Sequence, residues 1–209
     1  MSNQQNDLTW RETDLGPVPI STRYDDPYYS LDNGLAEAEH VFIAGNDRAN
    51  RFAGPIRIAE LGFGTGLNFL ATIKAWKMAG HGQPLTFTSF EGFPLTRDAA
   101  AAALTAFPEV EGDATTLLNI WEAAHRGPAT YAPGVTVHII TGDVRDSLPT
   151  WEARADAWYL DGFSPAKNPD MWEASLMHAV ADHTTVGGTV ATYTAAGHVR
   201  RAKPGVRVI

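Results

Sequence analysis

Apolar residues follow two different spacings along the chain, and these spacings alternate from residue 55 onward. Short apolar runs typical of buried strands are separated by longer segments whose apolar residues recur three and four positions apart, as in helices. Strands that alternate with helices predict an α/β fold, in which a mostly parallel sheet carries helices on both faces. The predicted strands are residues 56–60, 85–90, 135–140, 155–160 and 189–194.

The predicted helices carry their apolar residues on one face. They are residues 34–42, 67–79, 99–106, 117–124 and 171–182, and Thr96 is placed to cap the third of them. Residues 1–52 are polar and rich in turn formers, which predicts an N-terminal extension of short elements packed on the core. Residues 53–209 contain no internal repeat and no linker, so we expect them to form one globular unit.

The composition is that of an ordinary globular protein, with 44% hydrophobic and 19% charged residues. The 24 acidic and 16 basic side chains give a formal net charge of −8, which disfavours nucleic-acid binding by bulk charge but is compatible with a local basic patch. The absence of cysteine excludes disulfides and thiolate metal sites and fits a reducing cytosol. With no apolar leader, no long apolar run and no metal-ligand spacing among the histidines, we expect a cytoplasmic protein with no metal and no membrane contact.

A glycine-rich loop is the sharpest local signal. Residues 60–66 read Glu-Leu-Gly-Phe-Gly-Thr-Gly and lie between a predicted strand and its helix. Gly62, Gly64 and Gly66 allow a tight turn and a close approach of a ligand, and the next helix offers unpaired N–H groups to a carboxylate. A dinucleotide site has the spacing G-x-G-x-x-G, whereas the third glycine here comes one residue early. The alternative interpretation is a tight turn without a ligand.

This G-x-G-x-G spacing after an acidic strand end resembles the first motif of Rossmann-like, S-adenosylmethionine-dependent methyltransferases. The resemblance implies that the loop holds the methionine part of this cofactor, with Glu60 near the ammonium group. Glu91 ends the second predicted strand, where a carboxylate can accept both hydroxyls of a ribose. Asp143 follows the third strand, and an aspartate there commonly receives the adenine amino group in this fold family. A surface glutamate and a turn aspartate stay open as alternatives for these two residues.

Four longer segments resemble a single family. They are YDDPYYSLDNGLAEAEHVFIAGN at 24–46, ELGFGTGLNFL at 60–70, SFEGFPLTR at 89–97 and DAWYLDGFSPAKNPDMW at 156–172. They are similar to the methyltransferase half of the MnmC family, bifunctional enzymes of tRNA 5-methylaminomethyl-2-thiouridine biosynthesis, or to a stand-alone relative. The resemblance implies a methyltransferase domain over residues 53–209 that uses S-adenosylmethionine to methylate the 5-aminomethyl group of wobble (2-thio)uridine in tRNA. The FAD of the family's oxidase half is not expected in this chain, and a separate FAD-dependent oxidase is a candidate partner.

The segment after the fourth predicted strand carries the candidate chemistry, because open α/β sheets bind ligands at the carboxyl ends of their strands. Asp161 is the candidate carboxylate that accepts an N–H hydrogen bond from the attacking amine, which has to be unprotonated. Phe163, Tyr28 and Tyr29 are candidate walls for a splayed nucleotide, with core packing as the alternative. Candidate phosphate contacts, with a solvated surface as the alternative, are Lys167, Arg200 and Arg201.

The chain departs from the family pattern after residue 201. The family continues there into a basic segment and a final strand, whereas this chain has AKPGVRVI. We therefore expect truncated C-terminal strands and an exposed sheet edge, unless a partner or the N-terminal extension covers it. Two alternative functions follow from this difference and from the negative charge. One is a cofactor-binding paralogue with little or no activity, and the other is a small-molecule amine methyltransferase.

Overall fold

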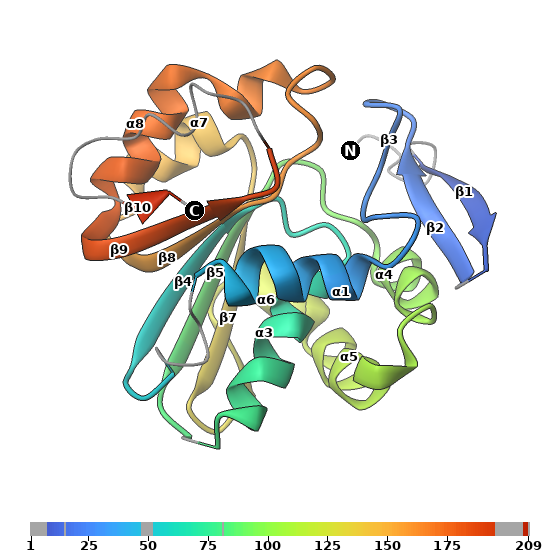
Figure 1. Cartoon of the computed structure of the whole chain (residues 1–209), viewed down its shortest axis with the longest axis horizontal. Helices are drawn as coiled ribbons and strands as arrows, with labels where there is room; N and C mark the ends of the chain where they lie inside the picture. The colour runs from blue at the N-terminus through green and yellow to red at the C-terminus, as the bar shows by residue number, and fades with distance from the viewer. Residues whose placement is uncertain (1–7, 15, 47–51, 81, 195–206, 209) are drawn as a thin grey trace.

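A seven-stranded sheet forms the centre of the molecule (Figure 1) in the part of the chain that the computed structural model describes, residues 8–14, 16–46, 52–80, 82–194 and 207–208. The strand order is β10-β9-β8-β4-β5-β7-β6, and neighbouring strands are parallel except for β6 and β7. The predicted mostly parallel sheet is confirmed. The strands are β4 (Ile56–Leu61), β5 (Leu85–Glu91), β6 (Ala129–Ala132), β7 (Val135–Thr141), β8 (Ala155–Leu160), β9 (Thr184–Thr192) and β10 (Arg207–Val208).

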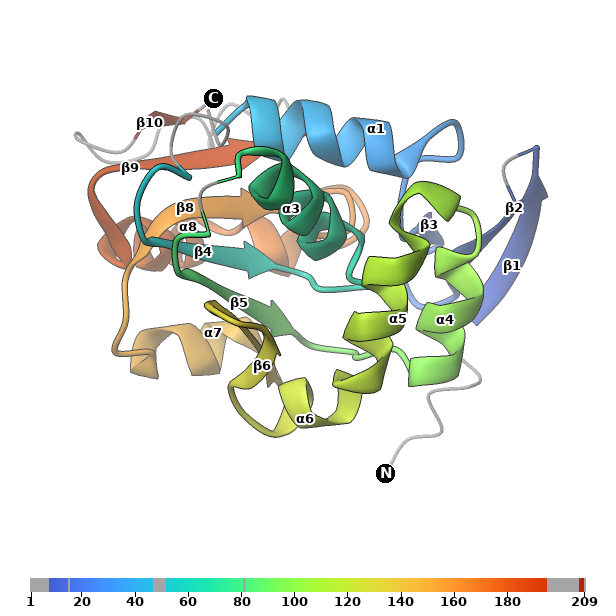
Figure 2. The same cartoon turned by 90° about the horizontal axis from the view of Figure 1, so that it is seen from below.

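Helices cover both faces of this sheet, as Figure 2 shows. Successive residues of a buried strand point to opposite faces, so Tyr159 of β8 enters one hydrophobic core and Trp158 enters the other. The first face packs against α1 (Gly34–Ala38), its π-helical continuation η2 (Glu39–Ala44), α3 (Leu67–Met78), α5 (Glu111–Asn119) and α6 (Trp121–Arg126). The second face packs against α7 (Val144–Ser147), η4 (Leu148–Thr150), η5 (Pro169–Trp172) and α8 (Ala174–Asp182).

The N-terminal residues form a small antiparallel sheet followed by a helix. This sheet consists of β1 (Leu8–Thr13), β2 (Gly16–Ser21) and β3 (Asp26–Pro27), and it lies to one side of the central sheet (Figure 1). The helix predicted over 34–42 is confirmed as α1 and η2, and the ring of Phe42 stacks on Tyr159 with 5.0 Å between centroids. This contact supports packing of the extension on the core, although the division of the chain at residue 52 stays a prediction.

Several predicted boundaries differ from the structure. The helix predicted over 117–124 is two helices, because Ile120 leaves the helical conformation (φ −108°, ψ 5°) between α5 and α6. The helix predicted over 171–182 begins at Ala174, because a 3₁₀ turn precedes it. The strands β1, β2, β3 and β6 and the helix α7 were not predicted. The two to four residues of β3, β6 and α7 show too few repeats of a period, whereas β1 is mostly exposed and prolines interrupt the sequence of β2.

Other predictions agree with the structure. Thr96 caps α4 (Arg97–Leu104) by accepting a hydrogen bond from the Ala99 N–H at 3.2 Å, and η3 (Pro108–Val110) follows this helix. At the other end of the chain, the two residues of β10 pair with Thr189 and Val190 of β9. The expected truncation of the last strands also concerns residues 195–206 and 209, which lie outside the described residues.

The turn from β4 to α3 determines where the ends of the central strands meet. The Gly62 N–H donates to the Phe90 carbonyl at 2.8 Å, and the Asp161 N–H donates to the Leu61 carbonyl at 3.2 Å. Gly62 has a φ of +87°, and a Cβ on this residue would lie 2.3 Å from the carbonyl oxygen of Asp161. Glycine is therefore required for the loop after β4 to lie directly against the loop after β8.

We expect Gly62→Ala to lower the free energy of unfolding by about 3 kcal/mol or more, because it combines backbone strain with a clash against a main-chain carbonyl. Chemical denaturation of the purified variant measures this loss. Gly112→Ala is the matched control, since Gly112 lies in α5 with open space around it, and the change should be neutral or stabilising by up to about 1 kcal/mol. Equal stabilities of the two variants would contradict the requirement for glycine at position 62.

Candidate active site

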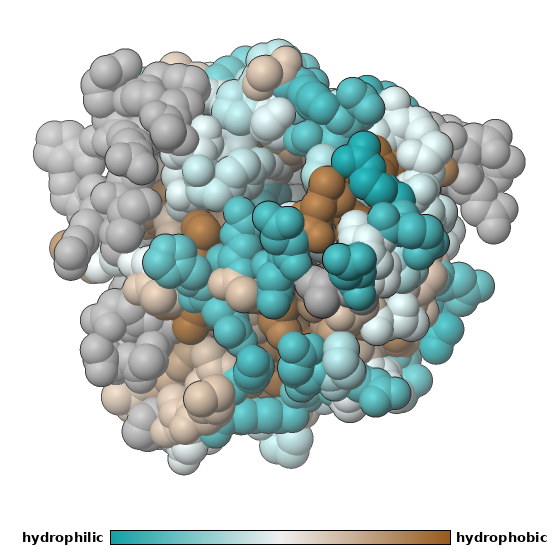
Figure 3. All heavy atoms as spheres, turned by 45° about the vertical axis from the view of Figure 1, so that its right-hand side comes forward, coloured by the Kyte–Doolittle hydropathy of each residue, from teal (hydrophilic) through white to brown (hydrophobic). Residues whose placement is uncertain are grey.

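A cavity of about 760 Å³ lies at the carboxyl ends of the central strands, a size typical of small-ligand sites. The sheet order reverses at β4, which has β5 on one side and β8 on the other, and ligands bind in open α/β sheets beside such a point. The face brought forward in Figure 3 carries mostly polar side chains with small apolar patches between them. The predicted site residues that line the cavity are Tyr28, Tyr29, Gly62, Gly64, Glu91, Asp143, Asp161 and Phe163.

The glycine loop forms the floor of this cavity between β4 and α3. Gly62, Gly64 and Gly66 all have positive φ angles, and Gly66 is the N-cap residue of α3. No side chain caps this helix, so the N–H groups of its first turn are available to an acceptor. The arrangement suits an anionic group such as a carboxylate at the start of α3.

Glu60 is completely buried at the end of β4, behind the glycine loop. Its Oε1 accepts a hydrogen bond from the Asn68 side chain at 2.9 Å, whereas its Oε2 has no partner among the described residues. Burial raises the pKa of Glu60 to about 8, and the nearby carboxylates of Asp161 and Glu91 raise it as well, against the opposing effect of the Ser89 and Asn68 side chains. The site thus holds an acid that gains stability from a positively charged ligand.

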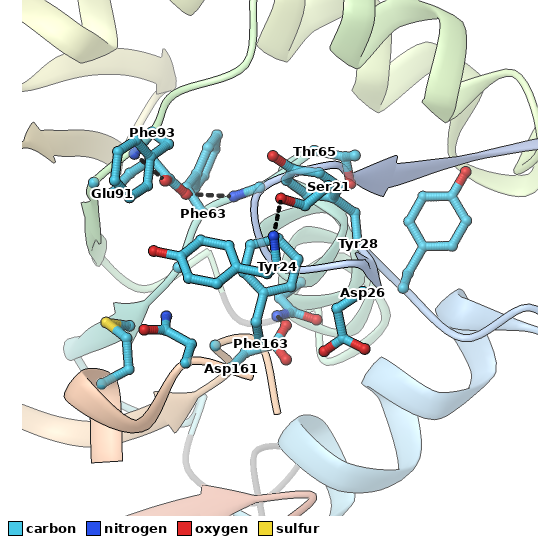
Figure 4. A pocket seen from close by; sticks show the side chains of 18 of the residues that line it. Ser21, Tyr24, Asp26, Tyr28, Phe63, Thr65, Glu91, Phe93, Asp161 and Phe163 are labelled. Carbon is cyan, nitrogen blue, oxygen red and sulfur yellow. Dashed lines mark hydrogen bonds between the residues drawn. The ribbon is translucent and has the colours of Figure 1, made fainter. Parts of the chain in front are cut away.

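Asp161 follows β8 and lines the same cavity (Figure 4). Its Oδ2 accepts a hydrogen bond from Asn68 Nδ2 at 2.5 Å, so one amide nitrogen donates to both Glu60 and Asp161. Burial raises the pKa of Asp161 to about 7, and Glu37 adds to the rise, while the hydrogen bond from Asn68 lowers it. Asn68 was not predicted from the sequence, although an asparagine in the first turn of a helix that follows a glycine loop is a detectable signal.

Glu91 uses both carboxylate oxygens for backbone hydrogen bonds. Oε2 accepts from the Gly64 N–H at 2.9 Å and Oε1 accepts from the Phe93 N–H at 2.7 Å, which ties the glycine loop to the loop after β5 (Figure 4). Each carboxylate oxygen can accept more than one hydrogen bond. The predicted role of Glu91 toward a ribose is compatible with this geometry and stays a prediction.

Asp143 lines the cavity but also has a structural role as the N-cap residue of α7. Its carboxylate accepts from the Arg145 N–H at 2.9 Å and forms an ion pair with the Arg145 guanidinium at 2.6 Å. These hydrogen bonds hold the pKa of Asp143 below its ordinary value. Arg145 also reaches Asp170 at 3.0 Å, so the alternative interpretation of Asp143 as a turn residue has direct support beside the predicted adenine contact.

Aromatic side chains from distant segments gather over the cavity (Figure 4). Phe163 stacks on Tyr24 with 4.8 Å between ring centroids and meets Tyr28 edge-on at 5.1 Å. Tyr24 also meets Phe93 edge-on at 6.1 Å, and the Arg23 guanidinium carbon lies 4.3 Å from the Phe93 centroid. Sequence reasoning named Phe163 and Tyr28 but missed the other three, whose separation along the chain gave no signal.

The remaining predicted substrate residues have other contacts or lie outside the description. The Tyr29 hydroxyl is within hydrogen-bond distance of the carbonyls of Pro17 and Ala103, and burial raises its pKa. The Lys167 ammonium donates to the Asp25 carbonyl and pairs with the carboxylates of Asp25 and Asp26. These contacts favour the alternative of core packing for Tyr29. Lys167, whose alternative was a solvated surface position, is paired with two carboxylates. Arg200 and Arg201 lie outside the described residues.

No group of three or more histidine, aspartate or glutamate side chains in the described residues is arranged to hold a metal ion. No helix in the same residues is long and apolar enough to cross a membrane.

Comparisons with known proteins agree with the fold. A family described as S-adenosyl-L-methionine-dependent methyltransferase matches residues 108–204. The tRNA 5-methylaminomethyl-2-thiouridine biosynthesis bifunctional proteins MnmC of Stutzerimonas stutzeri and of a Caulobacter species are 42% and 43% identical to this chain over 207 and 205 residues. The alignments cover 95% and 93% of this chain but 31% and 34% of those proteins, so the chain spans about a third of their length.

A solved structure supports the same fold. The crystal structure of MNMC2 from Aquifex aeolicus superposes with a TM-score of 0.73 over 92% of this chain and 62% of that one, at 22% sequence identity. The likeness confirms the Rossmann-like methyltransferase fold. The chain therefore has the fold of S-adenosyl-L-methionine-dependent methyltransferases, is similar to that family over residues 108–204, and is similar over nearly all of its length to about a third of the MnmC proteins.

Proposed function

We propose that this chain transfers a methyl group from S-adenosylmethionine to the amine of 5-aminomethyl-(2-thio)uridine at the wobble position of tRNA. The observation that carries the proposal is the position of Asp161, which faces the cavity beside the glycine loop and is held there by Asn68. The names of the MnmC relatives support the choice of substrate. A cytoplasmic site of action and a separate FAD-dependent oxidase that supplies the amine belong to the same proposal.

The residues of the cavity fit S-adenosylmethionine. The buried Oε2 of Glu60 lacks a hydrogen-bond partner among the described residues, as a position next to an ammonium group requires, and the uncapped start of α3 suits the carboxylate of the same amino acid. Glu91 and Asp143 line the other part of the cavity, where the nucleoside would lie. When bound, this cofactor supplies an electrophilic methyl group on a sulfonium, which an amine lone pair displaces.

In this proposal the protein contributes position and a proton acceptor. Phe163 and Tyr28 confine the base so that the amine lies near Asp161, and the Phe163 backbone is itself held by the Trp172 indole N–H at 2.9 Å. An ionised Asp161 accepts a hydrogen bond from the neutral amine and takes the proton that the amine loses after it has gained the methyl group. Acidic side chains at this end of the cavity, Asp26 and Glu37 besides Asp161, attract an amine substrate.

Labelled methyl transfer is the direct test of the proposed function. Incubation with methyl-labelled S-adenosylmethionine and tRNA that carries the unmethylated 5-aminomethyl group should label the tRNA at the wobble uridine, as nucleoside analysis would show. tRNA that already carries the methylated amine is the matched control and should accept far less label. Label on small amines alone, or cofactor binding without transfer to any acceptor, would contradict the proposal and favour the other two functions.

The Asp161→Asn variant should transfer methyl groups to tRNA at least about 100-fold more slowly, with little change in cofactor affinity, because the amide cannot take a proton. For the unaltered protein, kcat/KM should rise with pH through about 7 as Asp161 ionises. The variant should lose that ionisation and keep only the titration of the amine. Methyl transfer at the normal rate by Asp161→Asn would show that another group accepts the proton.

Cofactor binding should release a proton at neutral pH. The pKa of Glu60 is about 8 in the ligand-free protein, so its carboxyl is mostly protonated at pH 7, and a bound cation favours the ionised form. Affinity for S-adenosylmethionine should therefore increase as pH rises toward about 8 and then level off. Titration calorimetry in two buffers of different ionisation enthalpy measures the proton release. Glu60→Gln should remove most of it, and Glu152→Gln, which changes an exposed acid outside the cavity, should not change it.

A further inference from the structure

Asn68 occupies a position that links two parts of the cavity. It lies in the first turn of α3 and is only 7% exposed, so its side chain has a fixed environment. Its Nδ2 donates to Glu60 Oε1 at 2.9 Å and to Asp161 Oδ2 at 2.5 Å. Its backbone carbonyl accepts from the Thr72 hydroxyl at 2.8 Å, one turn along the helix. A primary amide nitrogen carries two hydrogens, and here each hydrogen has its own carboxylate.

A neutral donor between two acids has a particular electrostatic effect. A lysine at this position would neutralise one carboxylate, whereas the amide stabilises the charged forms by hydrogen bonds alone and leaves the pKa values of both acids raised. Each carboxylate then responds to the charge of the other and to any cation that enters the cavity. The chemistry of asparagine thus keeps the pair sensitive to a cationic ligand near neutral pH.

The other titratable groups around Asp161 are acids or a phenol. Burial and, after it, Glu37 of α1 raise the pKa of Asp161. Burial and, after it, Asp161, Asp26 and Glu37 raise the pKa of the Tyr193 phenol. Asp26 is paired with Lys167 at 3.6 Å. In the described part of the chain, burial and Glu37 raise the pKa of Asp161, and only the hydrogen bond from Asn68 lowers it.

We infer that Asn68 is a positioning residue for methyl transfer, which fixes the Asp161 carboxylate toward the amine and couples its ionisation to the charge state of Glu60. This inference rests on the proposed function and extends it. An ionised Glu60 opposes the ionisation of Asp161 because the two charges are alike, and a cation next to Glu60 offsets this repulsion, so that the hydrogen bond from Asn68 then favours the ionised form of Asp161. The acceptor for the substrate proton is therefore available when the cofactor site is filled.

Asn68→Ala tests the inference, because it removes both donors and leaves both acids. Titration of the side-chain carboxyl carbons by NMR, in ligand-free protein and with Asp161→Asn for assignment, should place the Asp161 midpoint higher by roughly one pH unit in the variant. The kcat/KM for tRNA should fall about five-fold at pH 7 and recover most of the loss at pH 9, where Asp161 is ionised in either protein. Asn68→Ser, which keeps one donor, should be intermediate.

Thr72→Val is the matched control on the same helix. Thr72 is fully buried and bonds to the Asn68 carbonyl, but it donates to neither carboxylate, so this variant should lose stability without moving the Asp161 midpoint. An unchanged midpoint in Asn68→Ala, or an equal loss of rate at pH 7 and pH 9, would overturn the inference and leave Asn68 with a packing role. If the unaltered protein transfers no methyl to tRNA, the proposed function fails, and the carboxyl titration still decides the role of Asn68.

Discussion

The candidate site depends on the burial of carboxylates that share hydrogen-bond donors but contact no cation in the described part of the chain. Glu60 and Asp161 accept from one amide, and Glu91 accepts from two backbone N–H groups. Burial of Glu60 and Asp161 without a cation costs free energy, which raises the pKa values of these two acids. An arrangement of this kind is stabilised when a positively charged ligand enters. S-adenosylmethionine carries two positive groups, a sulfonium and an ammonium. The free energy that the ligand-free protein loses by burying its acids is therefore partly recovered when this cofactor binds.

The register of the parallel strands brings these acids together from distant parts of the sequence. Leu61 of β4 lies opposite Leu160 of β8, and Glu60 lies opposite Ser89 of β5, so the residues that follow each strand emerge at one edge of the sheet. This part of the site could be predicted, because strand ends and glycine spacing are local features of the sequence. The same holds for the fold, since alternating strand and helix periods leave few topologies other than a doubly covered parallel sheet.

Other parts of the site arise from contacts that no local pattern encodes. Tyr24 meets Phe163, and Lys167 meets Asp25, only because the segment after β2 crosses the loop after β8. Lys167 was a candidate phosphate contact in the sequence. Its pairing with acids could not be predicted, because a proline-bounded loop gives no information about residues more than a hundred positions away. Short elements such as β6 and α7 were missed for a related reason, since four residues cannot establish a period and their stability comes from neighbours.

The charge of the protein limits how the proposed RNA substrate can be held. The net charge is −8, and Lys167 and Arg145 are paired to carboxylates near the cavity. These two residues therefore contribute little to RNA affinity through the release of counterions from phosphates. Recognition of a single nucleotide then depends more on stacking, which the rings of Tyr24 and Phe163 offer, and on acids that attract an amine. These acids attract an amine only when they are ionised, and Asp161 accepts a proton only when it is ionised. In the proposed reaction, substrate recognition and proton acceptance therefore both require ionised carboxylates. Asn68 contacts Glu60 and Asp161 at once, and this is why a single neutral amide can influence both.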